Sequence, residues 1–233
     1  STPSRTRWTS SSAIGIELVT LARTHLPRHR AAARAHLRAV DPAWGPILDA
    51  VGRCRLEHRA GGSHFAYVLR SIVYQQLSGK AAATIFGRVQ ALYPNGEPTP
   101  GAVLRTEQAQ LRAAGLSERK AEYVLELARR TTDASFPIDR LHEMPDHEVM
   151  NTLVTVRGIG RWTAQMVLMF RLGRPDVLPE LDLGIQKAVQ RMRRMRKLPT
   201  PAQLQQIGAP WAPYRTIASW YLWRSLDPIP VEY

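Results

Sequence analysis

The sequence predicts an all-α fold, and three observations support this. No segment alternates between apolar and polar residues at period two over the length of a strand. Helix-start signals recur along the chain, as Ser, Thr-Pro or Asp-Pro placed before apolar runs. With 233 residues, of which 44% are hydrophobic, the chain can form one core or two small ones. We therefore expect about ten helices joined by short capped turns.

The first half of the chain divides at clear breaks. Residues 1–12 are polar and Ser-rich, so we expect a flexible N-terminus. Residues 29–39 are rich in Ala and Arg and contain no breaker, and Asp41-Pro42 opens another helix. Ser63 then precedes one long helical region, expected over 64–92, which ends in the loop 94–100.

The second half repeats the same start signals. Ser117 is expected to cap a helix over 118–130. The other expected helix starts are Thr99-Pro100, Thr106, Asp146, Thr200-Pro201 and Pro213.

The charge balance indicates a polyanionic partner. The chain has 32 Lys and Arg against 19 Asp and Glu, a net charge of +13. Nucleic acid is the leading partner for such a surface, and an anionic membrane is the alternative. The densest basic run would contact phosphates without sequence preference, or is only a solvated face. It contains Arg191, Arg193, Arg194, Arg196 and Lys197.

Several classes of protein are excluded by composition. The single cysteine, Cys54, cannot form an intrachain disulfide, an iron–sulfur cluster or a cysteine-based zinc site. It indicates a reducing, intracellular setting. The histidines have no metal-ligand spacing. No apolar run approaches the roughly 18 residues of a membrane span, and residues 13–22 do not resemble a signal peptide.

One turn, Arg157-Gly158-Ile159-Gly160, separates two helical patterns. Glycine permits positive φ and close approach of another backbone. The free N–H groups at the start of the following helix carry the positive end of its dipole and suit a phosphate. Two glycines alone are a weak motif, and a plain turn between helices is an equal alternative. The surrounding string, LVTVRGIGRWTA, is more specific.

That string closely resembles the hairpin of the helix-hairpin-helix, Gly-Pro-Asp class of DNA glycosylases. Three further strings fit the 3-methyladenine DNA glycosylase II branch of that class, in the right order. They are SIVYQQLSGKAAATI, FRLGRPDVLPELDLGIQKA and WAPYRTIASWYLWRSL. The resemblance covers about Ser63 to Leu226.

The resemblance implies two helical subdomains flanking a DNA-binding cleft. We expect 64–174 to form a central subdomain, with the helix-hairpin-helix at about 148–172. Residues 13–63 and 175–233 would form the second, which carries the catalytic aspartate. The N-terminal β domain of the better-known branch is expected to be absent, because about sixty helical-looking residues precede Ser63.

The resemblance also implies how the hairpin functions. Main-chain amides would hold a DNA phosphate, and the expected phosphate-binding residues are Arg157, Gly158, Gly160, Arg161 and Thr163. The family often holds a monovalent cation on hairpin carbonyls, which here would be a structural Na⁺ or K⁺ on Val154, Val156 and Ile159. Arg157 stands where the family usually has Pro, which adds a cation near DNA.

Asp182 matches the catalytic position of the family. By position alone, an Asp before a helical run is most often an N-cap, and the two roles are compatible. Cleavage of an N-glycosidic bond builds positive charge on the sugar, and a fixed carboxylate stabilises that charge or orients the attacking water. Asp176 and Glu180 are expected to be solvated loop residues, so no general acid is evident.

Aromatic and polar side chains complete the expected site. Trp162 and Trp223 match the base-pocket aromatics of the family, although core packing is the alternative for each. Met166 stands where a related member carries an aromatic. Gln76 would fill the gap left by the flipped base, with Gln75 beside it at the minor groove. Their placement within a helix also suits a solvated face.

These residues predict a monofunctional enzyme. Relatives that also cut the strand use a Schiff-base Lys two residues past the hairpin, where this chain has Trp162. We expect excision of alkylated bases such as 3-methyladenine and 7-methylguanine, which initiates base excision repair. A cationic alkylated purine needs no acid to leave.

The resemblance and composition imply the remaining properties. The substrate would be double-stranded DNA containing alkylated bases, with no membrane partner and no required cofactor or catalytic metal. We expect a monomer that is cytoplasmic or nucleoid-associated. One alternative is a non-catalytic helix-hairpin-helix DNA-binding or repair-adaptor protein. A helix-turn-helix regulator fits less well, because the helix after Gly160 is apolar.

Overall fold

The computed structural model describes residues 26–58, 61–133 and 136–226. Within these ranges every regular element is a helix and no strand is present, which confirms the all-α prediction. The predicted flexible segment 1–12 lies outside the described residues. None of the helices in the described ranges is long and apolar enough to cross a membrane.

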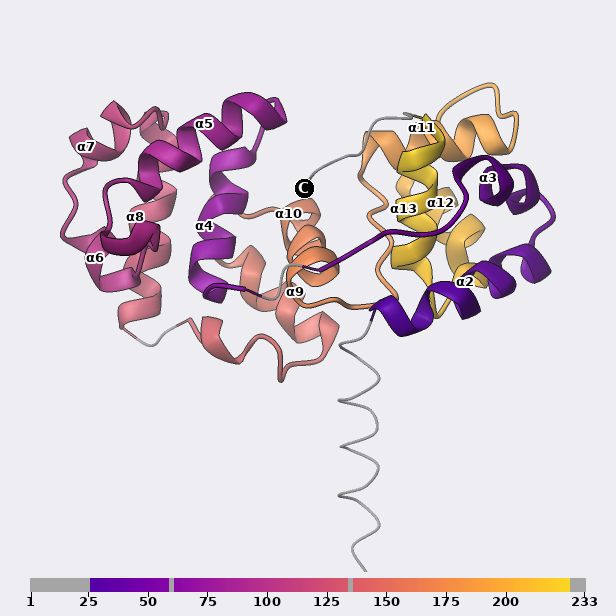
Figure 1. Ribbon diagram of the computed structural model, residues 1–233, viewed down its shortest axis with the longest axis horizontal. Coiled ribbons are helices and arrows are strands. Elements are labelled where there is room, and N and C mark those ends of the chain that lie inside the picture. The colour runs from indigo at the N-terminus through magenta and orange to yellow at the C-terminus, as the bar shows by residue number, and fades with distance from the viewer. Residues whose placement is uncertain (1–25, 59–60, 134–135, 227–233) are drawn as a thin grey trace, which may run out of the picture.

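The helices form two groups that lie side by side (Figure 1). The central lobe runs from α4 to η3. Its elements are α4 (His64–Tyr74), α5 (Gly79–Gln90), η1 (Pro94–Gly96), α6 (Pro100–Leu104), α7 (Gln108–Ala113), α8 (Glu118–Thr132), η2 (Ile138–Arg140), α9 (Asp146–Val154), α10 (Arg161–Met166) and the π-helical η3 (Val167–Arg171).

The second lobe combines segments from both ends of the described chain. Its elements are α2 (Leu26–Val40), α3 (Trp44–Val51), α11 (Leu183–Met192), α12 (Pro201–Gly208), η4 (Ala209–Trp211) and α13 (Arg215–Leu226). Helix α13 contacts α2, α3 and α11, so it forms the centre of this lobe. Trp44 and Trp211 are fully buried there and meet edge to face at 5.1 Å.

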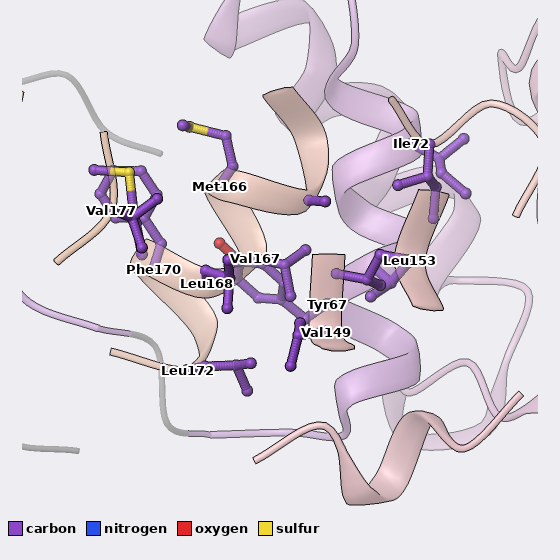
Figure 2. Packing of buried hydrophobic residues seen from close by; sticks show 14 of the residues in the cluster. Tyr67, Ile72, Val149, Leu153, Met166, Val167, Leu168, Phe170, Leu172 and Val177 are labelled. Carbon is purple, nitrogen blue, oxygen red and sulfur yellow. The ribbon is translucent and has the colours of Figure 1, made fainter. Parts of the chain in front are cut away.

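One part of the core of the central lobe lies between α4, α9 and the α10–η3 helix, and another lies where α8 packs against α4, α6 and α7. Figure 2 shows Tyr67 and Ile72 from α4 facing Val149 and Leu153 from α9 and Val167 from η3. All five side chains are buried. This packing fixes α10 against the lobe, and α10 is the helix that follows the hairpin.

Four predicted caps are confirmed by hydrogen bonds from the third helical N–H. They are Ser63, Thr99, Ser117 and Thr200. Four predicted starts were one or two residues off. The helix expected to open at Asp41-Pro42 begins at Trp44, with Ala43 as its N-cap. Asp146 is the first residue of α9 rather than its cap, Glu107 rather than Thr106 caps α7, and α13 begins at Arg215.

The single helical region predicted over 64–92 was wrong. Gln75 is extended (ψ 132°) and Gln76 is left-handed (φ 56°), so the backbone leaves the helix after Tyr74. Ser78 then caps α5 through the N–H of Ala81. Because Gln favours helices, the two glutamines gave no sign that the helix ends after Tyr74. The helix-start signal at Ser78 was also overlooked.

Candidate active site

Asp182 lies at the start of α11 and caps that helix. Its Oδ1 accepts the backbone N–H of Ile185 at 2.8 Å. The residue is only 9% exposed. The capping role weighed from the sequence is therefore real, and it fixes the orientation of the carboxylate.

Two indoles complete the hydrogen bonding of this carboxylate. Nε1 of Trp162 donates to Oδ2 of Asp182 at 2.8 Å, and Nε1 of Trp223 donates to Oδ1 at 2.9 Å. An ionised carboxylate can only accept hydrogen bonds. Here its two oxygens accept from three N–H donors, namely the Ile185 backbone and the two indoles. The carboxylate is thus held in place by dipoles, and none of these three partners carries a positive charge.

The two indoles reach Asp182 from different lobes. Trp162 lies on α10 of the central lobe, and Trp223 lies on α13 of the second lobe. Gly184 makes this approach possible, because a Cβ there would lie 3.0 Å from Asp182 Oδ1 and 3.1 Å from the Trp223 ring. Sequence reasoning missed this glycine, which appears as an ordinary helical residue in the sequence.

An aromatic pocket of about 360 Å³ opens beside Trp162. Trp162 and Met166 belong to its wall, as expected of base-pocket residues. Trp223 is not in the wall, but its ring stacks on Phe170, which is, with centroids 6.0 Å apart. The wall residues that sequence reasoning missed are Tyr67, Arg70, Ser71, Tyr74, Leu77, Gly79 and Phe170. The sequence did contain a signal for three of them. Helical spacing puts Tyr67, Ser71 and Tyr74 on one face of α4.

The hairpin joins α9 to α10 and requires one of its two glycines for folding. Gly158 has φ +88°, and a Cβ there would lie 2.1 Å from the Tyr123 ring. Gly160 has φ −88°, and a Cβ there would meet no other atom within 4 Å. No side chain caps the N-terminus of α10. The start of α10 therefore combines open space with uncapped N–H groups, as an incoming phosphate requires.

Arg157 and Arg161 differ in their surroundings. Arg157 is 67% exposed, with Glu122 at 3.8 Å and the Tyr123 ring below its guanidinium. Arg161 forms an ion pair through Nε with the buried Glu180. Of the two, Arg157 is the more available to DNA.

Thr163 does not face solvent as a phosphate donor would. It is 5% exposed, and its hydroxyl accepts a hydrogen bond from Gln75 Nε2 at 3.2 Å. The same amide group donates to the carbonyl of Gly158 at 2.8 Å. This corrects the placement of Thr163 on the DNA-facing surface: with Gln75 it joins the α4–α5 turn to the hairpin.

The two glutamines therefore lie in different surroundings. The Gln75 amide is engaged inside the protein, whereas Gln76 is exposed at the tip of the turn and also lines the aromatic pocket. This turn replaces the mid-helix position inferred from the sequence. The insertion of Gln76 into the duplex stays a prediction.

The expectation that Asp176 and Glu180 are solvated was wrong. Asp176 forms two hydrogen bonds with the Arg215 side chain, at 2.7 and 2.8 Å. Glu180 is 5% exposed and accepts from Gln165 Nε2 at 2.7 Å as well as from Arg161. Burial acts to raise the pKa of Glu180, but the hydrogen bonds, led by Arg161, hold it below its ordinary value.

The hairpin carbonyls are main-chain groups and do not need a cluster of acids. No group of three or more His, Cys, Asp or Glu residues suited to a metal occurs in the described part of the chain. The Val156 carbonyl accepts the Ile159 N–H at 3.0 Å, which closes the turn and leaves its second lone pair. A Na⁺ or K⁺ bound to the carbonyls of Val154, Val156 and Ile159 therefore stays a prediction.

The basic run at the end of α11 and just beyond it is largely exposed. Arg193 pairs with Asp41, which joins it to α3 through the turn before that helix. The other members lie on the surface, namely Arg191, Arg194, Arg196 and Lys197.

A helical hairpin, an aromatic pocket and a fixed carboxylate between two lobes form the arrangement of a base-excision DNA repair protein. Comparison with known proteins agrees. A family model described as HhH-GPD superfamily base excision DNA repair protein matches residues 69–213. The chain belongs to this superfamily.

Named relatives lie within the 3-methyladenine branch. DNA-3-methyladenine glycosylase 1 of Schizosaccharomyces pombe is 33% identical over 196 residues, covering 83% of this chain and 86% of the relative. The solved structure of the S. pombe 3-methyladenine DNA glycosylase with abasic DNA has a TM-score of 0.74, 32% identity and coverage of 83% and 96%. A DNA-3-methyladenine glycosidase from Bacillus halodurans has a TM-score of 0.72, 32% identity and coverage of 82% and 88%.

Proposed function

We propose that this protein is a monofunctional DNA glycosylase that hydrolyses the N-glycosidic bond of alkylated bases and so initiates base excision repair. The observation that carries the proposal is the position of Asp182. This buried carboxylate is held by two indoles, and one of those indoles also forms the wall of the aromatic pocket. Relatives that are similar over most of their length are named as 3-methyladenine glycosylases.

The nucleotide must leave the duplex to reach this site, because base stacking hides the glycosidic bond. Flipping costs a few kcal/mol. Stacking of the base on aromatic side chains offsets part of this cost, and the pocket wall offers Trp162 and Tyr74 for this purpose. A cationic alkylated purine gains additionally from cation–π attraction.

Asp182 then acts on the sugar. As the bond between C1′ and the base nitrogen breaks, its electron pair leaves with the base and positive charge grows on the sugar. The fixed carboxylate stabilises that charge, orients the water whose oxygen bonds to C1′ and accepts the proton that this water loses. Because the indoles hold both oxygens in advance, little reorganisation is needed in the transition state.

Alkylated bases suit this site because the described lining of the aromatic pocket contains no Asp, Glu or His that could act as a general acid. Glu180 and Asp176, the carboxylates nearest Asp182 in the chain, are both paired with arginines. A purine that carries positive charge becomes neutral when it leaves, so it requires no proton. We therefore infer a preference for 3-methyladenine- and 7-methylguanine-type lesions.

The phosphate backbone would be held by the start of α10 and by Arg157. In the same proposal Gln76 enters the gap in the duplex, and Na⁺ or K⁺ stabilises the hairpin carbonyls. The protein acts as a monomer on double-stranded DNA, inside the cell at the nucleoid. Sedimentation with and without a DNA duplex tests the monomer directly.

The test of function is base release from duplex oligonucleotides that each carry one defined methylated base. Release of the methylated base, leaving an abasic site and an intact strand, supports the proposal. Salt-sensitive DNA binding without release from any methylated duplex would instead favour a non-catalytic DNA-binding protein.

A further inference from the structure

We propose that Glu180 is a positioning residue for Asp182 and that Arg161 is its counter-ion rather than a DNA phosphate contact. This inference rests on the proposed function in one respect, since it assigns the residues that hold the catalytic carboxylate in place. From its position next to the hairpin glycines, Arg161 was expected to bind a DNA phosphate. The proposal replaces that role with an ion pair to Glu180.

Glu180 is one of the few acidic side chains buried in the described part of the molecule. Both of its carboxylate oxygens are occupied from α10. Arg161 Nε donates to Oε1, and Gln165 Nε2 donates to Oε2 at 2.7 Å. A buried carboxylate that accepts hydrogen bonds from two donors, one of them charged, is held in one orientation.

The backbone around Glu180 is fixed as well. Its own carbonyl accepts from Gln186 Nε2 at 3.0 Å, on α11. Gln165 also donates to the Leu178 carbonyl at 3.0 Å, and the Asp182 N–H donates to the Pro179 carbonyl at 3.0 Å. The segment from Leu178 to Asp182 is therefore tied to α10 on one side and to α11 on the other.

The first turns of α10 provide three contacts to this segment. Arg161 and Gln165 bind Glu180, and Trp162 binds Asp182. The same turn starts at Gly160, where the phosphate is expected. The position of the Asp182 carboxylate and the binding of the DNA backbone therefore both depend on the start of α10.

Arg157 provides the contrast within the same hairpin. Its ion-pair partner Glu122 is 42% exposed and 3.8 Å away, whereas Glu180 has a side chain only 6% exposed. Loss of Arg157 leaves no buried charge unpaired. Loss of Arg161 leaves the Glu180 carboxylate buried without its cation, so the segment must shift or Glu180 must take up a proton.

The experiment compares Arg161→Met with Arg157→Met. For each variant and the wild type we would measure the single-turnover rate of base release from a 7-methylguanine duplex. DNA affinity would be measured over a series of salt concentrations. Displacement of Asp182 by about 1 Å predicts a rate lower by about 100-fold for Arg161→Met. Its DNA affinity and salt dependence should equal those of the wild type.

Arg157→Met should differ mainly in binding. A lost phosphate contact weakens DNA binding and lowers the slope of log K against log salt by about 1. Thermal melting of every variant shows whether it is folded under the assay conditions.

The double variant Arg161→Met/Glu180→Gln keeps the inference testable if Arg161→Met unfolds. Removal of both charges leaves no unpaired buried ion, so the double variant should have a higher Tm than Arg161→Met. A double variant that melts no higher than Arg161→Met would overturn the inference. A wild-type rate for Arg161→Met together with weaker, less salt-dependent binding would overturn the inference. Absence of release by the wild type would instead refute the proposed function.

Discussion

Trp162 Nε1 donates to Asp182 Oδ2 at 2.8 Å, from the central lobe to the second lobe. The hydrogen bond links a helix that follows the hairpin to the cap of α11, 20 residues further along the chain. Trp223 bonds the other oxygen from α13. The Asp182 carboxylate is therefore placed by packing between two lobes, and the local sequence around Asp182 supplies only the cap.

Replacing Trp162 with Phe should slow base release while keeping an aromatic pocket wall. A hydrogen bond to a charged group contributes about 1.5–3 kcal/mol, and about 1.4 kcal/mol corresponds to tenfold, so we expect a rate lower by about 10- to 100-fold. The measurement is single-turnover release from a 7-methylguanine duplex. Trp220→Phe is the matched control, because Trp220 packs on Tyr221 and has no bond to Asp182. Equal rates for both variants would contradict this role.

Replacing the two hairpin glycines with Ala should give separate defects. Gly158→Ala forces a left-handed alanine, at about 1–2 kcal/mol, and adds the clash with Tyr123, so its Tm should fall. Gly160→Ala meets open space at an ordinary φ, so its Tm should match that of the wild type. Its DNA affinity should decrease because the methyl group occupies the phosphate approach. Calorimetry and a DNA titration measure the two effects, and tight DNA binding by Gly160→Ala would exclude a phosphate there.

Borohydride should trap no covalent adduct between the enzyme and methylated DNA. Strand cleavage by this class needs an amine that attacks the sugar, and the hairpin carries Trp162 where that amine would stand. The measurement is gel analysis of enzyme, duplex and sodium borohydride after complete base release. An endonuclease III-type bifunctional glycosylase is the positive control. A strong adduct band for this protein would show that another amine reaches the sugar.

Stability should fall as pH decreases from about 6.5 to about 4, partly because of His64. Burial, followed by the charge of Arg171, lowers the pKa of His64 to about 4. In this range the unfolded chain binds a proton at His64 and the folded chain does not, so acid favours unfolding. His64 Nδ1 accepts from Arg171 Nε at 2.9 Å, which protonation would abolish.

The variant His64→Gln isolates this contribution. Its amide oxygen can still accept from Arg171, but it has no proton to gain. The plot of Tm against pH from about 7 to about 4.5 should therefore be flatter for His64→Gln than for the wild type. Parallel curves would show that His64 contributes nothing to acid sensitivity.

Local signals predicted the helices because their causes are local. A capping hydroxyl and an apolar stripe act within one or two turns, and Ser63 and Ser117 were identified in this way. Asp182 was selected as the catalytic candidate because it matches the aspartate position of the family motif. Its capping hydrogen bond alone would not distinguish it from any other helix-capping aspartate. The α4–α5 break was missed because a left-handed Gln76 has no strong sequence signal.

Pairings between distant residues could not be predicted from the sequence. Glu180 looks like a loop carboxylate until Arg161 and Gln165 are folded against it. Gln75 looks like a helix surface residue until the Gly158 carbonyl is placed beside it. In each case the partner lies at least 15 residues away, and only the packing of the lobes brings the two together.

Asp182→Asn on a single 7-methylguanine duplex is the most direct test of the catalytic assignment. Asn is also a good N-cap and has the same size, so the variant should fold and bind the duplex like the wild type. It lacks the charge that stabilises the developing sugar cation. We predict undiminished binding and no base release above the uncatalysed rate. Release at the wild-type rate by a folded Asp182→Asn enzyme would contradict the central claim.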